Sequence, residues 1–210
     1  MIEILDEENY EKAVFTLAGK DADLANIVEN FGIPPTWFRV SGFPTLVHII
    51  LEQQVSLASA KACFDKLNAV CEPLTPENFL RFSDEELKKI GFSRQKTLYS
   101  RELANAVLNK TLDWENLSEF SDEKVRAELT RIKGIGNWTA DIYLLMSLLR
   151  PDVMPKGDLA LHVAWKNLNN LPNRPTSDEF LEIAERWKPN RAVAARLLWH
   201  FYLCEKRQKS

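Results

Sequence analysis

Apolar residues recur with helical spacing along almost the whole chain of 210 residues. Side chains three and four positions apart share one face of a helix, whereas a half-buried strand alternates at every second residue. No convincing run of alternation appears, so the pattern predicts an all-α fold. Leu57 and Leu98 are expected on apolar helix faces. Helices are predicted over 7–18, 21–30, 44–51, 56–70, 93–109, 137–149 and 190–205, with others starting at Ser83, Ser121, Asp158 and near Ser177.

The composition is that of a soluble globular chain, with 45% apolar and 27% charged residues. Seven Gly and ten Pro are few for this length, which argues against a turn-rich all-β fold and against disorder. No stretch approaches the roughly 18 apolar residues of a membrane helix. The acidic N-terminus lacks the basic-then-apolar layout of a secretory signal. Cys63, Cys71 and Cys204 have no CxxC spacing, so we expect reduced thiols in a cytosolic protein.

The charge is unevenly distributed, although the formal net charge is only −3. Residues 1–31 hold eight acids and two bases, which leaves the rest of the chain with a net charge of +3. Within 124–133, four bases face one acid. A basic patch of this kind can contact phosphates even in an acidic protein, but an isolated charge run is more typical of a solvated helix face.

The segment from Leu129 to Asp158 carries the most specific signal. A helix ending near Thr130, the turn Lys133-Gly134-Ile135-Gly136 and a helix from Asn137 form a predicted helix-hairpin-helix motif, over about residues 126–149. Glycine permits backbone angles that side chains oppose and lets a phosphate approach closely. The N–H groups opening the second helix can then bind that phosphate. An ordinary helical corner with glycines for packing has the same local pattern.

Four segments, in this order, resemble the helix-hairpin-helix DNA glycosylase superfamily, and within it the glycosylases for alkylated bases of the 3-methyladenine type. The resemblance runs from about residue 34 to 203 and rests on ILEQQVSLASA (50–60), KGIGNWTAD (133–141), MPKGDLAL (154–161) and AERWKPNRAVAARLLW (184–199). It implies two helical lobes, one of residues 42–150 and one of 1–41 plus 151–210, with an active-site cleft between them.

The resemblance implies that Asp158 is the catalytic carboxylate. An ionised carboxylate beside the sugar stabilises the positive charge that develops as the base leaves, and it can orient or activate water. The spacing alone fits a helix N-cap equally well, and the two roles are compatible. Strand-cutting members carry a Lys where this chain has Trp138, so the resemblance implies a monofunctional enzyme.

An aromatic pocket is implied as well, because rings favour a cationic alkylated base by stacking and by cation–π attraction. Trp138 and Trp199 match two pocket aromatics of the family. A third is replaced by Ile142, with Tyr143 beside it as a further pocket candidate. Trp37 is a candidate for the mouth of the pocket, with core packing as the alternative.

Reaching the base requires flipping it out of the duplex. Gln54 matches the family's intercalating wedge, and Gln53 is a candidate for hydrogen bonds near the flipped sugar or the orphaned base; idle, solvent-exposed glutamines are the alternative. The remaining DNA-binding candidates lie in the hairpin: Lys133, Gly134, Ile135, Gly136, Asn137 and Thr139.

No cofactor is expected for the chemistry, and no iron–sulfur cluster, because Cys204 alone lies beyond residue 71. Relatives hold a monovalent cation through hairpin carbonyls, which here belong to Thr130, Ile132 and Gly134. The histidines are isolated, and His162 lies one turn after Asp158.

The expected function is therefore excision of alkylated purines (3-methyladenine and 7-methylguanine type) from damaged double-stranded DNA by a monomer in the cytoplasm, associated with the nucleoid, or in the nucleus of a eukaryote. A glycosylase for deaminated or oxidised bases and a DNA-damage-binding protein with little or no catalysis are alternatives. A helical module that binds protein is a third.

Overall fold

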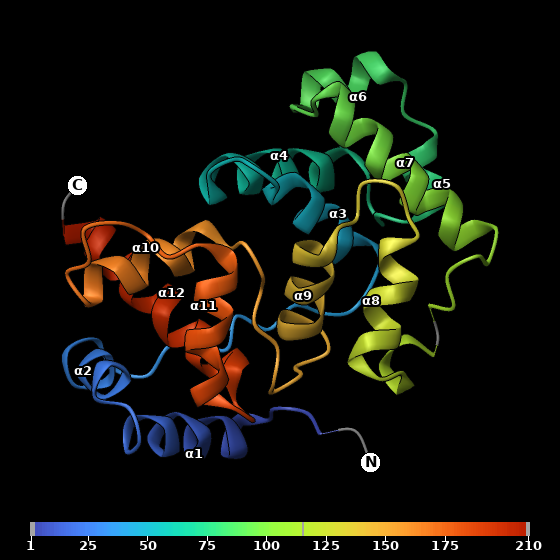
Figure 1. The fold of residues 1–210 in the computed structure, drawn as a ribbon. Helices are drawn as coiled ribbons and strands as arrows, with labels where there is room; N and C mark the ends of the chain where they lie inside the picture. Colours follow the sequence, from blue (N-terminus) through green and yellow to red (C-terminus); the bar gives the residue numbers. More distant parts are fainter. Residues whose placement is uncertain (1–2, 115, 209–210) are drawn as a thin grey trace. The chain divides into compact units, whose positions relative to one another are not determined.

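The structure of the protein is a computed structural model that describes residues 3–114 and 116–208. Every regular element in these two ranges is helical, which confirms the predicted all-α fold (Figure 1). No helix in them is long and apolar enough to cross a membrane. The α-helices are α1 (Glu7–Ala18), α2 (Ala22–Phe31), α3 (Phe43–Glu52), α4 (Leu57–Val70), α5 (Pro76–Leu80), α6 (Asp84–Ile90), α7 (Arg94–Leu108), α8 (Asp122–Thr130), α9 (Asn137–Met146), α10 (Leu159–Leu168), α11 (Ser177–Ala184) and α12 (Arg191–Gln208).

Two compact units divide the chain. The central unit is Arg39–Tyr143, and the terminal unit combines the residues up to Phe38 with those from Leu144 onward. These boundaries differ by a few residues from the lobes expected from the sequence. The second boundary falls inside α9, so the first turns of this helix belong to the central unit.

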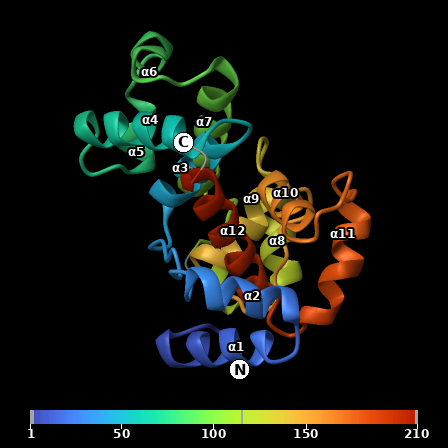
Figure 2. The same cartoon turned by 90° about the vertical axis from the view of Figure 1, so that its left-hand side faces the viewer.

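The terminal unit is built around α12, which packs against α10, α2 and α1 (Figure 2). The guanidinium of Arg196 on α12 is fully buried and donates to the carbonyls of Thr36, Ala192 and Leu145. Because these donors are satisfied by backbone oxygens, a cation is tolerated inside the core. The buried Trp187 donates its indole N–H to Asp21, the N-cap of α2, at 2.7 Å. The ERWKP segment therefore has a packing role.

The central unit has α3 at its core, packed against α4 and α7, while α5 packs against α7. The predicted burial of helix 44–51 is confirmed, since Leu46, Val47 and Ile50 are fully buried. The predicted apolar faces of helices 56–70 and 93–109 are wrong at one position each. Leu57 is 57% exposed, because it opens α4 directly after an exposed turn, and Leu98 is 39% exposed. The buried stripe of α7 instead consists of Thr97, Ser100, Leu103 and Ala104, whose small or γ-branched side chains fit between helices.

Most helix starts follow the sequence signals. Ser83, Ser93, Ser121 and Thr176 accept hydrogen bonds from the N3 backbone of α6, α7, α8 and α11, as N-cap side chains do. Helix α5 was not predicted, although Thr75 caps it and Pro76 opens it. Its five residues are too few to give a periodic signal.

Helix α9 ends at Met146, three residues before the predicted end at Leu149. Leu149 has a φ of +53°, and the N–H of Arg150 donates to the carbonyl of Leu144 at 3.0 Å. This left-handed cap closes the helix before Pro151 is reached, so the proline is not what ends it.

Candidate functional site

The predicted helix-hairpin-helix motif lies in the central unit, where α8 and α9 lie side by side, joined by the turn of residues 131–136 (Figures 1 and 2). The Nε of Arg126 on α8 contacts Oδ1 of the buried Asp141 on α9 at 2.6 Å and holds the two helices together. Gly134 has a φ of +93°, and a Cβ atom built on it would lie 2.0 Å from Cγ of Tyr99. The fold therefore requires glycine at this position.

Gly136 differs, because a Cβ atom there would meet nothing within 4 Å and its φ is not positive. The fold thus leaves open space at Gly136. In the described part of the chain, the N–H groups of Gly136 and Asn137 donate to no protein acceptor. They open α9, where the helix dipole favours an anion. The exposed Lys133 adds a cation on the same turn. These features fit close approach of a phosphate.

Three other hairpin candidates face inward. Ile135 and Ile132 are buried, and the N–H of Ile135 already donates to the carbonyl of Ile132 at 3.0 Å. The side chain of Thr139 is 1% exposed. A DNA contact by Ile135 or Thr139 would therefore go through the backbone, and it stays a prediction.

The hairpin is linked to the turn that follows α3. The side-chain Nε2 of Gln53 donates to the carbonyl of Gly134 at 2.9 Å and to Oγ1 of Thr139 at 3.0 Å. These bonds bring Gln53 together with two of the predicted hairpin residues inside one compact unit. The sequence gives no signal for this contact, because it joins positions 81 and 86 residues apart.

Gln54, the next residue, has a φ of +56° and an exposed side chain. The left-handed region disfavours residues with a Cβ by about 1–2 kcal/mol, so this turn holds Gln54 against its own preference. The neighbouring Val55 and Leu57 are also exposed, at 44% and 57%. An exposed polar residue in a strained conformation, followed by exposed apolar residues, is a candidate for a functional turn.

Asp158 lies in the terminal unit and is the N-cap of α10. Its Oδ1 accepts the backbone N–H of Leu161 at 3.0 Å and the indole Nε1–H of Trp199 at 3.1 Å. The residue is 8% exposed. One carboxylate oxygen of Asp158 thus accepts two hydrogen bonds, from the backbone of α10 and from the side chain of Trp199. The structure thus brings together the predicted catalytic residue and one predicted pocket aromatic.

His162, one turn further along α10, is also buried, and its Nε2 has no hydrogen-bond partner in the described residues. Its ring lies 4.9 Å from that of Phe180. Burial lowers the pKa of His162 below its usual 6.5; Asp158 opposes the shift and Arg174 reinforces it. This shift favours the neutral imidazole next to Asp158.

Trp37 packs edge-on against Trp199 in the terminal unit, with ring centroids 6.4 Å apart, and has a φ of +49°. Asp158, Trp199 and Trp37 thus form one group of neighbours. The other two aromatic candidates belong to the central unit. Trp138 is the half-buried second residue of α9. Tyr143 is 1% exposed, packs against Trp114, and has a pKa raised to about 12 by burial, so its ring contributes to the core of this unit.

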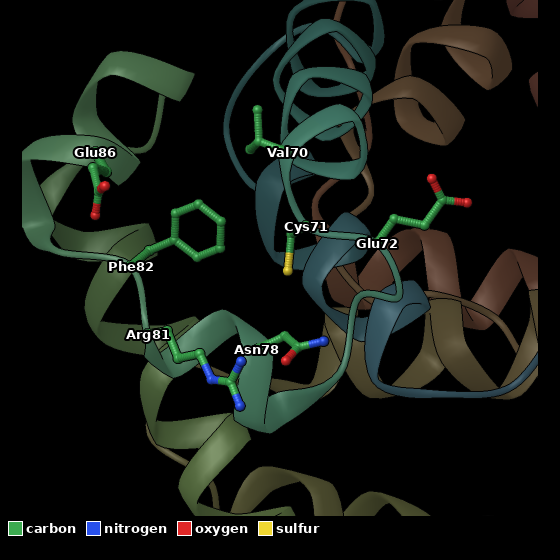
Figure 3. A pocket seen from close by; sticks show the side chains of 7 residues that line it. All are labelled: Val70, Cys71, Glu72, Asn78, Arg81, Phe82 and Glu86. Atoms are coloured by element: carbon green, nitrogen blue, oxygen red, sulfur yellow. The ribbon is translucent and has the colours of Figure 1, made fainter.

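A separate pocket of the central unit lies between the end of α4 and the α5–α6 region (Figure 3). None of the predicted site residues lines it. It is lined by Val70, Cys71, Glu72, Asn78, Arg81, Phe82 and Glu86. In the ranges that the structure describes, no three His, Cys, Asp or Glu side chains gather as a metal site would require.

Two structural residues of the hairpin escaped the sequence analysis. Tyr99 lies on α7 and fills the space beside Gly134, and Arg126 binds Asp141 across the motif. The four bases in 124–133 favour either a phosphate-binding patch or a solvated helix face, but one of them, Arg126, forms an ion pair with the buried Asp141. The signal available in the sequence was an acid, Asp141, within the apolar helix that follows the basic segment, because a buried acid needs a basic partner such as Arg126.

Comparison with known proteins gives a consistent result. Residues 47–190 match the family described as HhH-GPD superfamily base excision DNA repair protein. DNA-3-methyladenine glycosylase 1 of Schizosaccharomyces pombe is 30% identical over 195 residues, covering 90% of this chain and 86% of its own. The alkylbase DNA glycosidase-like protein mag2 of the same yeast is 27% identical over 201 residues, covering 92% of this chain and 94% of its own.

Solved structures agree. The S. pombe 3-methyladenine DNA glycosylase Mag1 in complex with abasic DNA is similar with a TM-score of 0.82 and 28% identity, over 93% of this chain and 97% of that one. A DNA-3-methyladenine glycosidase from Bacillus halodurans gives a TM-score of 0.74 at 30% identity, over 93% and 91% of the two chains.

Proposed function

Because the chain belongs to the HhH-GPD superfamily of base excision DNA repair proteins, we propose that it is a monofunctional DNA glycosylase that excises alkylated purines from duplex DNA. The observation that carries the proposal is the carboxylate of Asp158, buried at the N-terminus of α10 and held there by the indole N–H of Trp199. The similarity to proteins named for 3-methyladenine supports the choice of lesion.

Asp158 supplies the chemistry. When the N-glycosidic bond breaks, its electron pair leaves with the base and positive charge develops on the deoxyribose. The Asp158 carboxylate stabilises this charge and orients a water molecule, whose oxygen bonds to C1′ while its proton is released. An alkylated purine is already cationic, so it needs little protonation to leave. The product is a free base and an abasic site in an uncut strand.

The hairpin supports a monofunctional reaction. Strand cleavage through a Schiff base needs an amine close to the sugar, and the position after Asn137 holds Trp138. Lys133 is an amine, but it lies on the turn, where the open backbone groups of Gly136 and Asn137 favour phosphate as its partner. We therefore assign Lys133 to DNA binding.

The aromatic residues are assigned to the lesion. Trp138, Trp199 and Trp37 offer electron-rich faces, and stacking a cationic base on such a face is worth about 0.5–2 kcal/mol relative to a neutral one. The NH of Trp199 points to Asp158. The same residue thus orients the carboxylate and contributes a ring to its surroundings.

DNA is the proposed partner. More specifically, we propose that a monomer of the protein binds damaged double-stranded DNA. The open space at Gly136 and the N–H groups of Gly136 and Asn137, which have no acceptor among the residues that the structure describes, fit a phosphate of the damaged strand. The strained, exposed turn at Gln54 fits a wedge that fills the gap left by the flipped base. Such an enzyme acts at the nucleoid, or in the nucleus of a eukaryote.

A monovalent cation at the hairpin also belongs to the proposal. The carbonyl of Ile132 accepts from Ile135 and that of Gly134 accepts from Gln53, so each keeps a second lone pair. Together with the carbonyl of Thr130 they are hard oxygen donors suited to such an ion. When bound, it neutralises charge on an adjacent phosphate.

The test uses wild-type protein on methylated duplex DNA, with released bases separated by chromatography and strand integrity followed on a gel. We expect free 3-methyladenine and 7-methylguanine, and strands that break only on alkaline treatment. Cleavage through β-elimination, or a borohydride-trapped complex, would overturn the monofunctional assignment. Salt-sensitive DNA binding without release of any base would instead identify a DNA-damage-binding protein.

A further inference from the structure

The amide of Gln53 uses both of its hydrogens inside the protein. Nε2 donates to the carbonyl of Gly134 at 2.9 Å and to Oγ1 of Thr139 at 3.0 Å. An amide nitrogen has two hydrogens, so none remains for another acceptor. The two acceptors lie on either side of Gly136 in the sequence, one in the turn and one in the first turn of α9. Gln53 therefore joins the end of α3 to the hairpin as a whole, and we call these two hydrogen bonds the Gln53 bracket.

The residue next to this bracket is strained. Gln54 has a φ of +56°, and its exposed side chain makes no hydrogen bond within the described residues that would hold it there. A strained backbone persists only where its surroundings fix it. On one side Gln53 ties the turn to the hairpin, and on the other Ser56 caps α4 by accepting the N–H of Ser59 at 3.2 Å. The turn of residues 53–56 is therefore fixed at both ends.

We propose that Gln53 is a positioning residue, which fixes the turn of residues 53–56 in register with the hairpin and so presents Gln54 at a set place relative to the bound phosphates. The inference rests on the proposed function and gives Gln53 a role other than the direct DNA contact expected from the sequence. Both elements must act on one strand at the same time: the hairpin holds its backbone while the turn enters the base stack. A bracket between them removes conformational freedom that binding would otherwise have to restrict.

Two chemical features make glutamine suited to this role. Its two N–H groups match two oxygen acceptors, and its length reaches the hairpin from the end of α3. Glu at this position would place a carboxylate against the carbonyl of Gly134, and Met would keep the length without any donor. Thr139→Val would remove one acceptor with little change in shape, whereas Thr139→Ser would keep it.

The experiment compares Gln53→Met with wild type in single-turnover base release from two duplexes. In one the lesion is paired; in the other it faces an abasic site and is already partly unstacked, which lowers the energy needed for flipping. We expect the variant to be about tenfold slower on the paired lesion and within about threefold of wild type on the unpaired one, because two hydrogen bonds are lost from the presentation of the wedge. Binding to undamaged duplex should stay within about twofold, since the hairpin keeps its own phosphate contacts.

Two further variants test the bracket itself. Thr139→Val should also slow base release from the paired lesion, but by less than Gln53→Met does. The double variant should lose less rate than the sum of the two single losses, because both substitutions break the same bracket. Thr139→Ser should release the base at a rate near that of wild type. Gln208→Met, at the exposed end of α12, is the matched control and should change nothing. Equal losses on both duplexes would show a merely structural role and overturn the proposal.

Failure of the proposed function is distinguishable from failure of this inference. If wild type releases no base, the function is wrong, and the bracket is tested without DNA by amide hydrogen exchange. Gln53→Met should then speed exchange about tenfold at residues 53–56 and in the hairpin turn while leaving α12 unchanged. Unchanged exchange in the hairpin turn would overturn the bracket.

Discussion

The indole Nε1 of Trp199 donates to the same carboxylate oxygen of Asp158 that caps α10, at 3.1 Å. One oxygen thus takes two donors, from α12 and from the backbone of α10, which fixes the direction of the carboxyl group. A hydrogen bond to a charged acceptor contributes about 1.5–3 kcal/mol. In the proposed reaction, this direction decides where the negative charge meets the sugar.

Trp199→Phe should therefore slow base release by about tenfold and lower the free energy of unfolding by about 2 kcal/mol, because the ring is kept and the donor is lost. Trp165→Phe is the matched control, since Trp165 is buried in the same unit and its contact with Trp187 is between rings. It should cost stability without slowing release. Single-turnover kinetics measure the rate of base release, and urea unfolding measures the free energy of unfolding. Equal rates of release for the two variants would show that Trp199 has no role in the mechanism.

The two hairpin glycines should separate stability from binding. Gly134→Ala combines a φ of +93° with overlap against Tyr99, so it should cost about 2 kcal/mol and lower Tm by roughly 4–8 °C. Gly136→Ala meets open space, so Tm should stay within about 1 °C while binding to duplex DNA weakens several-fold. Calorimetry and a fluorescence titration check the pair. Normal DNA binding by Gly136→Ala would argue against phosphate approach at this turn.

Lys133 should contribute one phosphate contact. Lys133→Gln is expected to weaken binding to damaged and undamaged duplexes alike and to reduce the slope of log K against log salt by about one. Arg81→Gln serves as control, because Arg81 is an exposed cation of the same unit that lies in the separate pocket (Figure 3). Titrations from low to moderate salt test this, and an unchanged slope for Lys133→Gln would exclude a phosphate contact.

Stability should fall as the pH drops below 6.5, the ordinary pKa of histidine. Burial lowers the pKa of His162, with Asp158 opposing and Arg174 reinforcing the shift, so the unfolded chain binds this proton at a higher pH than the folded one. The stability due to neutral His162 is complete above 6.5 and is lost as the pH falls toward the lowered value. His48, also lowered in pKa by burial, acts in the same direction.

His162→Phe should consequently reduce the loss of unfolding free energy between pH 7.5 and 5.5. The phenyl ring suits a site already packed against Phe180. Urea unfolding at the two pH values gives the difference, with His200→Phe as a control for a partly exposed histidine. An unchanged difference would mean that His162 does not titrate in this range.

The sequence predicted those features whose signal is local. Helix caps at Ser83, Ser121 and Asp158 and the glycine turn of the hairpin depend on residues a few positions apart, and the structure has them where they were expected. Local signals were weaker for α5, which has five residues. They were misleading at Leu98, because the buried stripe of α7 consists of Thr97, Ser100, Leu103 and Ala104, two of which are polar.

Long-range relationships escaped the sequence analysis. Gln53 was interpreted as a residue that meets DNA, because nothing near it in the sequence shows that its amide reaches Gly134 and Thr139. The clash that makes Gly134 obligatory comes from Tyr99, and the second partner of Asp158 is Trp199. Such contacts depend on tertiary packing, which composition and periodicity do not encode position by position.

The most direct test of the central claim is single-turnover base release from methylated duplex DNA by Asp158→Asn beside wild type. Asparagine caps helices as well as aspartate does, and its Oδ1 accepts the same hydrogen bonds from Leu161 and Trp199, so the variant removes the charge and little else. We predict that Tm and DNA binding are kept while release falls by at least about 100-fold. Release within about threefold of wild type would show that Asp158 is only a helix cap and would contradict the mechanism.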